Sequence, residues 1–318
     1  MKYIVSSLLL CSASLSAQVG YDTGFDLPHY VNEVLLSGQG EASNITYAGG
    51  LSQIGVFTDV MGLSNGLVMS TEAMVNAFCE NQTCLDCVGT SLSDADLLEV
   101  ANSVPPLIGQ SFNVSSVNDV AILEFDFMAM SNYLSIEFLF GSDEYPTYVY
   151  TQYNDVFAIF LSGPDIAGPY SSPAAFPDGA VNLAIVPGSS PPLPVTISSV
   201  NTQMNSEWYF DDPNLPGICL NGMTLPMLAE HPLTVGETYH LKFAIADGSD
   251  TALESVFMCQ AGIFSESEEQ LVNIEIGSDV GGLWNSEIFE SCGTLTLTLT
   301  RPALVSLSEP IATPLYFP

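Results

Sequence analysis

The sequence predicts an all-β fold: a β-sandwich or jelly-roll-like main domain with one or two short helices, followed by a partial second β-sandwich. Many short runs of residues with high strand propensity recur at close spacing. Turn signals separate these runs, for example GSDEYP at 141–146 and DDPNLPG at 211–217. Hydrophobic residues make up 47% of the chain and charged residues 12%, so the chain has enough material for a core. Many strands with few helices are typical of a sandwich or jelly roll.

The first third of the chain combines predicted strands with two predicted helices. Apolar stretches broken by Gly, Asn and Ser predict strands at 34–36, 45–47, 53–57 and 67–70. The segments 71–79 and 93–102 predict helices, because each begins with a Thr or Ser that can act as a cap and continues with apolar residues at helical spacing. In the second helix, Ser93 is the expected cap, and acidic residues occupy the first turn.

From residue 121 onward the pattern is that of strands. In 121–130 the alternation places Glu124 and Asp126 on one side of the strand, and the other side is apolar. Further strands are expected at 134–140, 155–161, 181–186, 195–200, 239–247 and 255–264. Together these segments predict a main domain over residues 18–264.

The two ends of the chain differ from this main domain. Residues 1–17 are expected to be a signal peptide, with Lys2 at its positive end, an apolar run at 4–10 and cleavage after Ala17. No later segment approaches the ~20 apolar residues that span a bilayer, so we expect no transmembrane segment and a secreted, extracellular or cell-surface protein. Residues 265–271 are expected to form a linker. The strand patterns at 272–276 and 294–300 begin the partial second domain, 272–318.

The charge balance is strongly acidic. The chain has 36 Asp and Glu residues but only 3 Lys and Arg, which gives a formal net charge of -33. Salt bridges can therefore neutralise few of the carboxylates, and the others must be solvated, bind metal ions or be screened by salt. Such a surface repels nucleic acid, and we expect no nucleic-acid partner. The simpler interpretation is that the acids serve solubility alone.

The cysteines indicate disulfide bonds. Six remain after the predicted signal peptide: Cys79, Cys84, Cys87, Cys219, Cys259 and Cys292. An even number in a secreted chain favours disulfides, and all but Cys292 are our candidates, with their pairing left open. Cys84 and Cys87 form a CxxC pair. It lacks both a second zinc-ligand pair and a thioredoxin-like context, so a structural disulfide is the favoured interpretation.

Six oxygen-bearing side chains at strand ends are the candidate metal ligands: Asp143, Glu144, Asn154, Asp155, Asp247 and Asp250. If the strands 134–140 and 155–161 are hairpin neighbours, the first four of these side chains converge at one end of a sheet. Calcium takes about six to eight oxygen ligands from carboxylates, carbonyls and water, so Ca²⁺ is the expected cofactor. The competing interpretation is that these residues are present as turn formers.

A catalytic interpretation is weaker. A glycosidase needs two carboxylates about 5–10 Å apart, but Asp143 and Glu144 point to opposite faces if extended. The residues His29, His231 and His240 are isolated, and the sequence has no HExxH, GxSxG or P-loop motif. The sequence therefore predicts a protein that is not an enzyme. Tyrosines near the acids, at 145, 148, 150 and 153, are interpreted as packing residues, with sugar stacking or protein anchoring as the alternative.

Several motifs, in their order, resemble the choice-of-anchor L domain of secreted bacterial surface proteins, which is frequent in Bacteroidetes. They include QIGVFTD at 53–59, DADLLEVAN at 94–102, IEFLFGSDEYPTYVYTQYNDVFAIFLSGPDI at 136–166 and GETYHLKFAIADGSDTALESVFM at 236–258. The resemblance covers most of residues 28–264 and implies an all-β extracellular module of mosaic surface proteins. Residues 272–318 resemble the start of a Calx-β or similar immunoglobulin-like repeat.

These observations predict a secreted adhesin-like module that binds Ca²⁺ and acts in surface or matrix interaction or in assembly. The expected partners are an extracellular protein or glycan, together with self-association through exposed edge strands. Two alternatives stay open at this point. One is an extracellular carbohydrate-active enzyme or lectin-like glycan-binding module, and the other is a self-assembling filament subunit.

Overall fold

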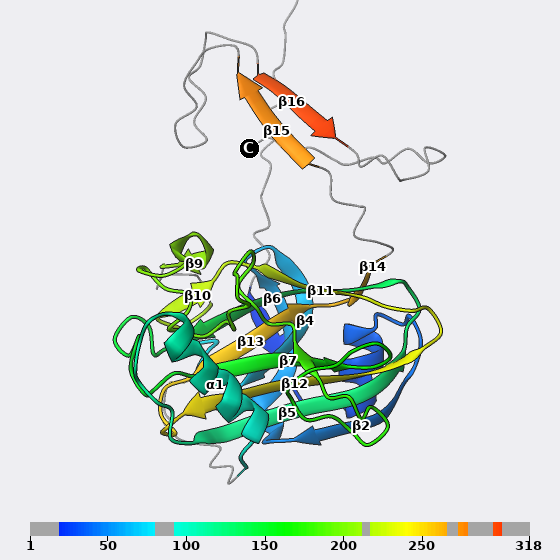
Figure 1. Cartoon of the computed structure of the whole chain (residues 1–318), viewed down its shortest axis with the longest axis horizontal. Helices are drawn as coiled ribbons and strands as arrows, with labels where there is room; N and C mark the ends of the chain where they lie inside the picture. Colours follow the sequence, from blue (N-terminus) through cyan, green and yellow to red (C-terminus); the bar gives the residue numbers. More distant parts are fainter. Residues whose placement is uncertain (1–18, 80–91, 212–216, 266–272, 279–294, 301–318) are drawn as a thin grey trace, which may run out of the picture.

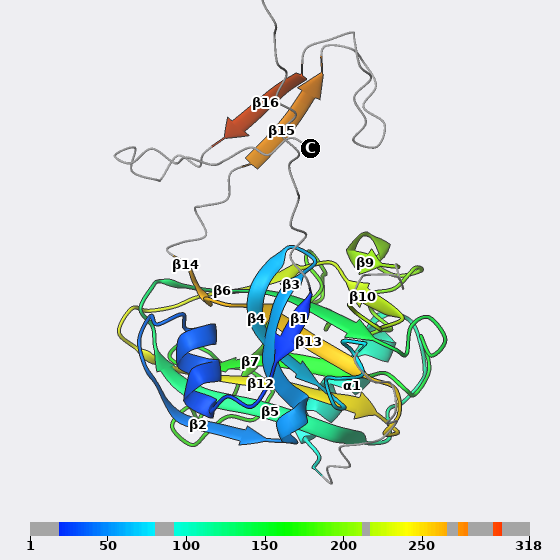
Figure 2. The ribbon, with the colours of Figure 1, turned by 180° about the vertical axis from the view of Figure 1, so that it is seen from behind.

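Two antiparallel sheets packed face to face form the main body of the protein (Figures 1 and 2). The computed structural model describes residues 19–79, 92–211, 217–265, 273–278 and 295–300. The chain is mostly β within these ranges, which confirms the predicted fold class. The predicted signal peptide and the linker from residue 266 lie outside the described residues.

Nine strands form the first sheet, called sheet A. Its main path runs in the order β1 (Gly20–Asp22), β3 (Ile54–Val60), β4 (Leu63–Ser70), β13 (Ser255–Gln260), β6 (Tyr133–Ser142), β10 (Gly222–Thr224) and β9 (Tyr209–Phe210). Two further strands also pair with β6, namely β11 (Met227–Pro232) and β14 (Phe264–Ser265).

Five strands form sheet B, in the order β2 (Ala42–Ala48), β5 (Val117–Met128), β12 (Thr238–Gly248), β7 (Val156–Ser162) and β8 (Val181–Asn182). The helical elements are α1 (Ala95–Leu107), the π-helix η1 (His29–Leu35) and the 3-10 turns η2 (Leu51–Gln53) and η3 (Ser206–Trp208). Figure 1 shows α1 lying over sheet B, and Figure 2 shows sheet A from the other side.

The main core lies between the sheets. Leu123, Phe125 and Phe127 of β5 point into it, as the alternation predicts. Aromatic rings join the two layers: Phe157 of β7 stacks on Phe257 of β13 with ring centroids 5.0 Å apart. Such pairs contribute beyond their buried area, so these rings fix the register of one sheet on the other.

The outer faces of both sheets are also partly covered, which explains why several strands are apolar on both sides. Helix α1 packs on the outer face of sheet B through Leu97, Val100 and Ala101. Every residue of β7 is buried, because one face of the strand belongs to this outer cluster and the other to the main core. The segments 74–79 and 217–223 cover the outer face of sheet A. A disulfide between Cys79 and Cys219 ties these two segments together.

The cysteine predictions have mixed outcomes. Cys79 and Cys219 are bonded, whereas Cys259 is a free thiol buried in the main core, so its nomination as a disulfide candidate is wrong. Cys259 lies in the middle of sheet A between β4 and β6, where it packs as a small apolar side chain. Cys84, Cys87 and Cys292 lie outside the described residues.

Helix α1 starts one residue later than predicted and ends five residues later. Its cap is Asp94 and not Ser93: the Asp94 carboxylate accepts a hydrogen bond of 2.9 Å from the backbone N–H of Leu97. Aspartate is at least as good a cap as serine, and Asp94 has a second partner in the fold, described below. The helix continues through Pro105 and Pro106 in its last turn.

The secondary structure of three short segments was predicted wrongly. A short apolar run shows that a segment is buried, but it does not show whether the segment is a strand, a helix or a turn. The predicted strand at 34–36 belongs to η1, whose buried residues Tyr30, Val31 and Leu35 face the core. The predicted helix at 71–79 forms only turns, and it ends at Cys79, which has a positive φ of 62° and carries the disulfide. The predicted strand at 195–200 is a buried turn with isolated bridges.

The strands at 134–140 and 155–161 are not hairpin neighbours, which corrects the premise of the predicted metal site. The first is part of β6 in sheet A and the second is part of β7 in sheet B. The segment 143–155 therefore crosses from one layer to the other. In the C-terminal unit, β15 (Asn273–Ser278) and β16 (Leu295–Thr300) form an antiparallel pair, and its remaining residues lie outside the described ranges.

Candidate functional site

Four strand ends, two from each sheet, meet at one edge of the sandwich. In sheet A, β6 ends and β13 begins with Ser142 paired to Ser255. In sheet B, β12 ends and β7 begins with Ala246 paired to Val156. The crossing segment 143–155 and the turn 249–254 connect these ends. All six predicted ligand residues therefore lie at one edge, although the chain reaches it by a different route from the predicted hairpin.

We call six residues at this edge the acid cluster: Asp143, Glu144, Asp155, Asp247, Asp250 and Glu254. Glu254 was not predicted, because it follows no motif and comes close to the others only through the pairing of β13 with β6. The buried carboxylates of Glu72 and Asp119 flank the cluster, and each has other contacts of its own. These residues come from both sheets, so the cluster is a product of the tertiary fold.

Asp155 joins the two sheets. Its side chain is fully buried and accepts hydrogen bonds from the backbone N–H of Gly248 at 2.9 Å and from the Ser255 hydroxyl at 2.7 Å. Gly248 has to be glycine because a Cβ there would lie 2.7 Å from the carbonyl oxygen of Asn154. This close approach of the backbones brings the end of β12 against the start of β7.

Three carboxylates of the cluster carry oxygens without hydrogen-bond partners, and Glu254, with both oxygens unpartnered, is one of them. Both oxygens of Asp247 lack one, and its exposed fraction is 0%. The Oε2 atom of Glu144 also lacks one, and Glu144 is 1% exposed. The side-chain nitrogen of Asn154, the one amide among the predicted ligands, is unpartnered as well, whereas its Oδ1 accepts from the backbone N–H of Ser198 at 3.3 Å. Buried polar atoms are normally satisfied, so these exceptions call for an explanation.

Burial and mutual repulsion raise the pKa values of these acids. Desolvation is the main cause for Glu144, and the charges of Asp155, Asp250 and Asp143 add to it, raising its pKa to about 9. Desolvation likewise raises the pKa of Asp155 to about 8, against the opposing effect of its two hydrogen bonds. The pKa of Asp247 rises well above its ordinary value through burial and the charge of Asp155, although the nearby Thr71 hydroxyl favours its ionised form.

The other acids line the rim of the cluster or lie behind it. Asp143 accepts from the backbone N–H of Asn221 at 3.1 Å, and burial, opposed by this bond, raises its pKa to about 6. Burial raises the pKa of Asp250, which is partly exposed. Glu254 is 2% exposed, and its pKa is raised by burial and by the charges of Glu72 and Asp143.

No basic side chain offsets this charge in the part of the chain that the structure describes. Lys242 is the one Lys or Arg there, and it lies five residues before Asp247 on β12, about 17 Å along the strand. Within the same residues, no group of three or more His, Cys, Asp or Glu side chains is arranged to hold a metal ion. Buried carboxylates without a cation must either bind protons or recruit a cation whose other ligands are neutral oxygens and water.

The predicted aromatic residues near the cluster are mostly packing residues. Tyr145 is 1% exposed, and its hydroxyl donates to the Val200 carbonyl at 2.7 Å. Tyr148 and Tyr153 are half-buried and meet edge to face, with ring centroids 5.4 Å apart. The rings of Tyr148 and Tyr153 hold the crossing segment in place. Tyr145 is buried, so its ring offers no exposed face on which a sugar could stack.

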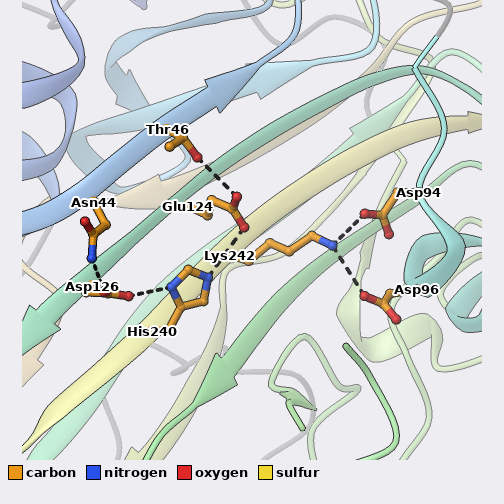
Figure 3. A network of polar contacts seen from close by, with 8 residues as sticks. All are labelled: Asn44, Thr46, Asp94, Asp96, Glu124, Asp126, His240 and Lys242. Carbon is orange, nitrogen blue, oxygen red and sulfur yellow. Dashed lines mark hydrogen bonds and ion pairs between the residues drawn. The ribbon is translucent and has the colours of Figure 1, made fainter. Parts of the chain in front are cut away.

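A second group of polar residues occupies the outer face of sheet B, where α1 does not cover it (Figure 3). A pocket of about 350 Å³ lies there, lined by Glu124, Phe160, Ser162, Ser171, Ser172, Pro173, His240 and Lys242. The strands β5, β7 and β12 form its floor, and the loop 171–173 forms one wall. The alternation in 121–130 predicts the side that Glu124 occupies, but the pocket itself follows from the loop and was not foreseen.

His240 lies between two carboxylates of β5. Its Nδ1 is 2.7 Å from Asp126 Oδ1, and its Nε2 is 3.5 Å from Glu124 Oε2 (Figure 3). Burial opposes the charged imidazole, but the contacts with Glu124 and Asp126 outweigh it and raise the pKa of His240. The nearby imidazole in turn lowers the pKa of Glu124 against the effect of burial. His240 is isolated in the sequence, so its ion pairs with two residues of β5 were not predicted.

Lys242 connects sheet B to the start of α1. Its ammonium group is 2.5 Å from Asp94 Oδ2 and 3.4 Å from Asp96 Oδ2 (Figure 3). The same group lies over the Phe160 ring, 5.2 Å from the ring centroid. Asp96 also accepts from the backbone N–H and the hydroxyl of Ser171. The helix start, the sheet and the pocket wall are thus held together around one cation.

Comparison with known proteins assigns the main part of the chain to a protein family. The family model of the choice-of-anchor L domain matches residues 19–265, which are most of the chain. No curated protein and no solved structure matches it. Among the described helices, none is both long enough and apolar enough to cross a membrane.

Proposed function

The chain belongs to the choice-of-anchor L family, and from this premise we propose that it is a non-enzymatic module of a cell-surface protein whose fold is completed by Ca²⁺. Domains of this family are typical of secreted and surface proteins, and the Cys79–Cys219 disulfide is consistent with an extracellular location. The module acts in adhesion or assembly at the surface, with an extracellular protein or glycan as its partner.

One observation carries the calcium proposal. Asp247 is fully buried, both of its carboxylate oxygens lack hydrogen-bond partners, and Glu144 and Asp155 lie in the same cluster. An ionised carboxylate in such a place is costly unless a cation accompanies it. A hard cation is the chemical match for an all-oxygen site, and calcium is the one that tolerates irregular coordination.

The remaining ligands would be neutral. Calcium accepts backbone carbonyls, amide oxygens and water, so a site does not need three carboxylates of its own. Such a site is expected to be of the weak extracellular class, with Kd of about 10⁻⁴–10⁻³ M. It would join sheet A to sheet B at the edge where their strand ends meet, and it would therefore act on the stability of the whole sandwich.

Calcium removal tests this proposal. At a calcium concentration about 100 times Kd, binding to the folded state alone adds about 2.7 kcal/mol, which corresponds to roughly 5–10 °C in Tm for a domain of this size. We expect the purified chain to melt that much higher in calcium than in chelator. Equal melting temperatures in the two conditions would refute the metal site.

A matched pair of variants locates the effect. Asp247→Asn keeps the shape of the side chain and removes the buried charge, so the variant should melt at or above the wild-type temperature in chelator and lose most of its response to calcium. Asp165→Asn is the control, because Asp165 is an exposed turn residue beyond the opposite end of β7. A full calcium response in Asp247→Asn would place any bound ion elsewhere on the acidic surface.

A further inference from the structure

The pocket on the outer face of sheet B has features of a ligand site that the fold itself does not require. Its floor is a rigid part of the sheet, contributed by Glu124, Phe160 and His240, and its wall is the loop at 171–173. Its volume of about 350 Å³ is at the lower end of the range for small-molecule sites and suits one sugar ring. The pocket lies away from the acid cluster, so it does not depend on the proposed calcium.

The pocket offers several hydrogen-bond acceptors to a ligand. Glu124 is ionised and 38% exposed, and only its Oε1 is engaged in a hydrogen bond, from Thr46 at 3.1 Å. The Nε2 atom of His240 is buried and lies 3.5 Å from Glu124 Oε2, so the histidine senses a ligand of Glu124 through this ion pair and does not contact the ligand itself. The hydroxyls of Ser171 and Ser172 donate to Asp96 and to the Phe176 carbonyl, which leaves their oxygens free to accept.

The charge of the pocket selects among possible ligands. Glu124 lines it, and three further carboxylates (Asp126, Asp94 and Asp96) pair with the two basic side chains of its lining, His240 and Lys242. The Lys242 ammonium is already engaged by Asp94 and Asp96, so it is not available to an incoming anion. Phosphate, sulfate and acidic sugars are therefore disfavoured.

We propose that this pocket binds a single uncharged sugar residue of an extracellular glycan. Sugar hydroxyls can donate to the acceptors that line the pocket, namely the Glu124 carboxylate and the hydroxyl oxygens of Ser171 and Ser172. Pro173 adds apolar surface for the C–H face of the sugar, whereas the Phe160 ring is 1% exposed and lies beneath the Lys242 ammonium. This proposal rests on the proposed function as a surface module, because it names a glycan as the partner. It does not depend on the calcium site.

The site binds and does not hydrolyse. Of the described residues that line the pocket, Glu124 alone carries a carboxylate. Hydrolysis of a glycosidic bond requires a second carboxylate facing the same bond. Asp126, the nearest other acid on β5, is occupied by the His240 ring and by the Asn44 side-chain amide at 2.6 Å.

The test follows the histidine side chains of the full chain by NMR while sugars are added. The chain has three histidines, so the ring signals of His240 can be assigned by substitution. We expect glucose, galactose, mannose or N-acetylglucosamine at millimolar concentration to shift the ring signals of His240 and to leave those of His29 and His231 unchanged. Glucuronate, which differs from glucose by its carboxylate, should bind at least about tenfold more weakly.

Two matched variants complete the test. Glu124→Gln preserves the size of the side chain and removes a charged acceptor, so the sugar affinity should fall by about tenfold or more. Glu137→Gln makes the same change at an exposed position on sheet A and should bind like the wild type. Three results would overturn the proposal: no uncharged sugar shifts His240, glucuronate binds as well as glucose, or Glu124→Gln binds as tightly as the wild type.

Discussion

Asp155 illustrates how single side chains decide what this edge of the sandwich can do. Its two hydrogen bonds come from residues at the end of β12 and at the start of β13, so one carboxylate fixes the relative position of both sheets. Its neighbours Asp247 and Glu144 have no comparable donors. The same edge therefore contains one satisfied acid and three acids with unpartnered oxygens, namely Asp247, Glu144 and Glu254, and these three determine how the site responds to protons and cations.

The sequence indicates part of this site and misses the rest for physical reasons. Asp143, Glu144, Asn154 and Asp155 are predictable because turn signals and strand starts show where strands end. Glu254 is not predictable in this way, because its place depends on the pairing of β13 with β6. The partners of His240 are also non-local: Asp126 lies 114 residues away in sequence.

His240 should make the stability of the protein depend on pH in a defined direction. Its pKa is raised in the folded state, so protonation stabilises the fold. The advantage of the wild type over His240→Gln should be complete below about pH 6.5, the usual pKa of histidine, and should vanish as the pH rises through the higher pKa of the folded state. We expect a difference of about 1–2 kcal/mol at low pH, mostly from Asp126, because Glu124 is 38% exposed.

Urea unfolding at a series of pH values, with calcium held constant, measures this difference. His231→Gln is the control, because His231 contacts the Pro232 carbonyl through Nδ1 and not a carboxylate. If the difference between wild type and His240→Gln were constant with pH, the ion pairs of His240 would not contribute to stability.

At the scale of elements, α1 depends on Lys242 for its attachment at the start. Asp94 both caps the helix and binds the lysine, and the side chains of Lys242, Asp94 and Asp96 are 13%, 11% and 9% exposed. Lys242→Met would leave two largely buried carboxylates without a cation. Breaking a buried pair in this way costs about 3 kcal/mol or more.

Hydrogen exchange together with urea unfolding measures this effect. We expect the amides in the first turns of α1 to exchange faster in Lys242→Met, because the start of the helix loses its attachment to sheet B. Glu99→Gln, an exposed change on the same helix, should leave both measurements near the wild-type values. A Lys242→Met variant as stable as Glu99→Gln would show that the apolar contacts of α1 suffice.

Elements with a clear period were predicted, and elements defined by distant contacts were not. The alternation in β5 gives both its existence and its buried face. By contrast, the apolar residues of η1 and of the turn at 195–200 are buried by contacts with the main core, and short apolar runs of this kind fit a strand equally well. Assigning β6 and β7 to one hairpin failed because sequence proximity does not reveal that the chain changes sheets between them.

At the scale of the whole molecule, the acids should make the metal-free protein less stable as the pH rises. The pKa of Asp143 is raised to about 6, that of Asp155 to about 8 and that of Glu144 to about 9, so the folded state binds protons more tightly than the unfolded chain. Stability in chelator should therefore be greatest at low pH within this range and fall from about pH 5 to about pH 9. Calcium, which favours the ionised acids, should flatten this decline, and the gain in Tm from calcium should grow with pH.

Calorimetry with and without calcium over this pH range provides the measurement. Asp155→Asn separates the cluster from His240, because it should reduce the pH dependence in chelator while the contribution of His240 persists. A stability in chelator that increases towards high pH would contradict the assignment of raised pKa values to these acids.

The position of β13 has a consequence for how the molecule is made. This strand is nearly the last of the domain in sequence, yet it lies between β4 and β6 in the centre of sheet A, where Val256 pairs with Ser70 on one side and with Gly141 on the other. Until the ribosome has delivered residue 260, β4 and β6 lack their shared neighbour, and sheet A remains two unconnected fragments. Sheet A of the nascent chain therefore cannot be completed before β13 has emerged from the ribosome, and long-range strand pairings of this kind form slowly.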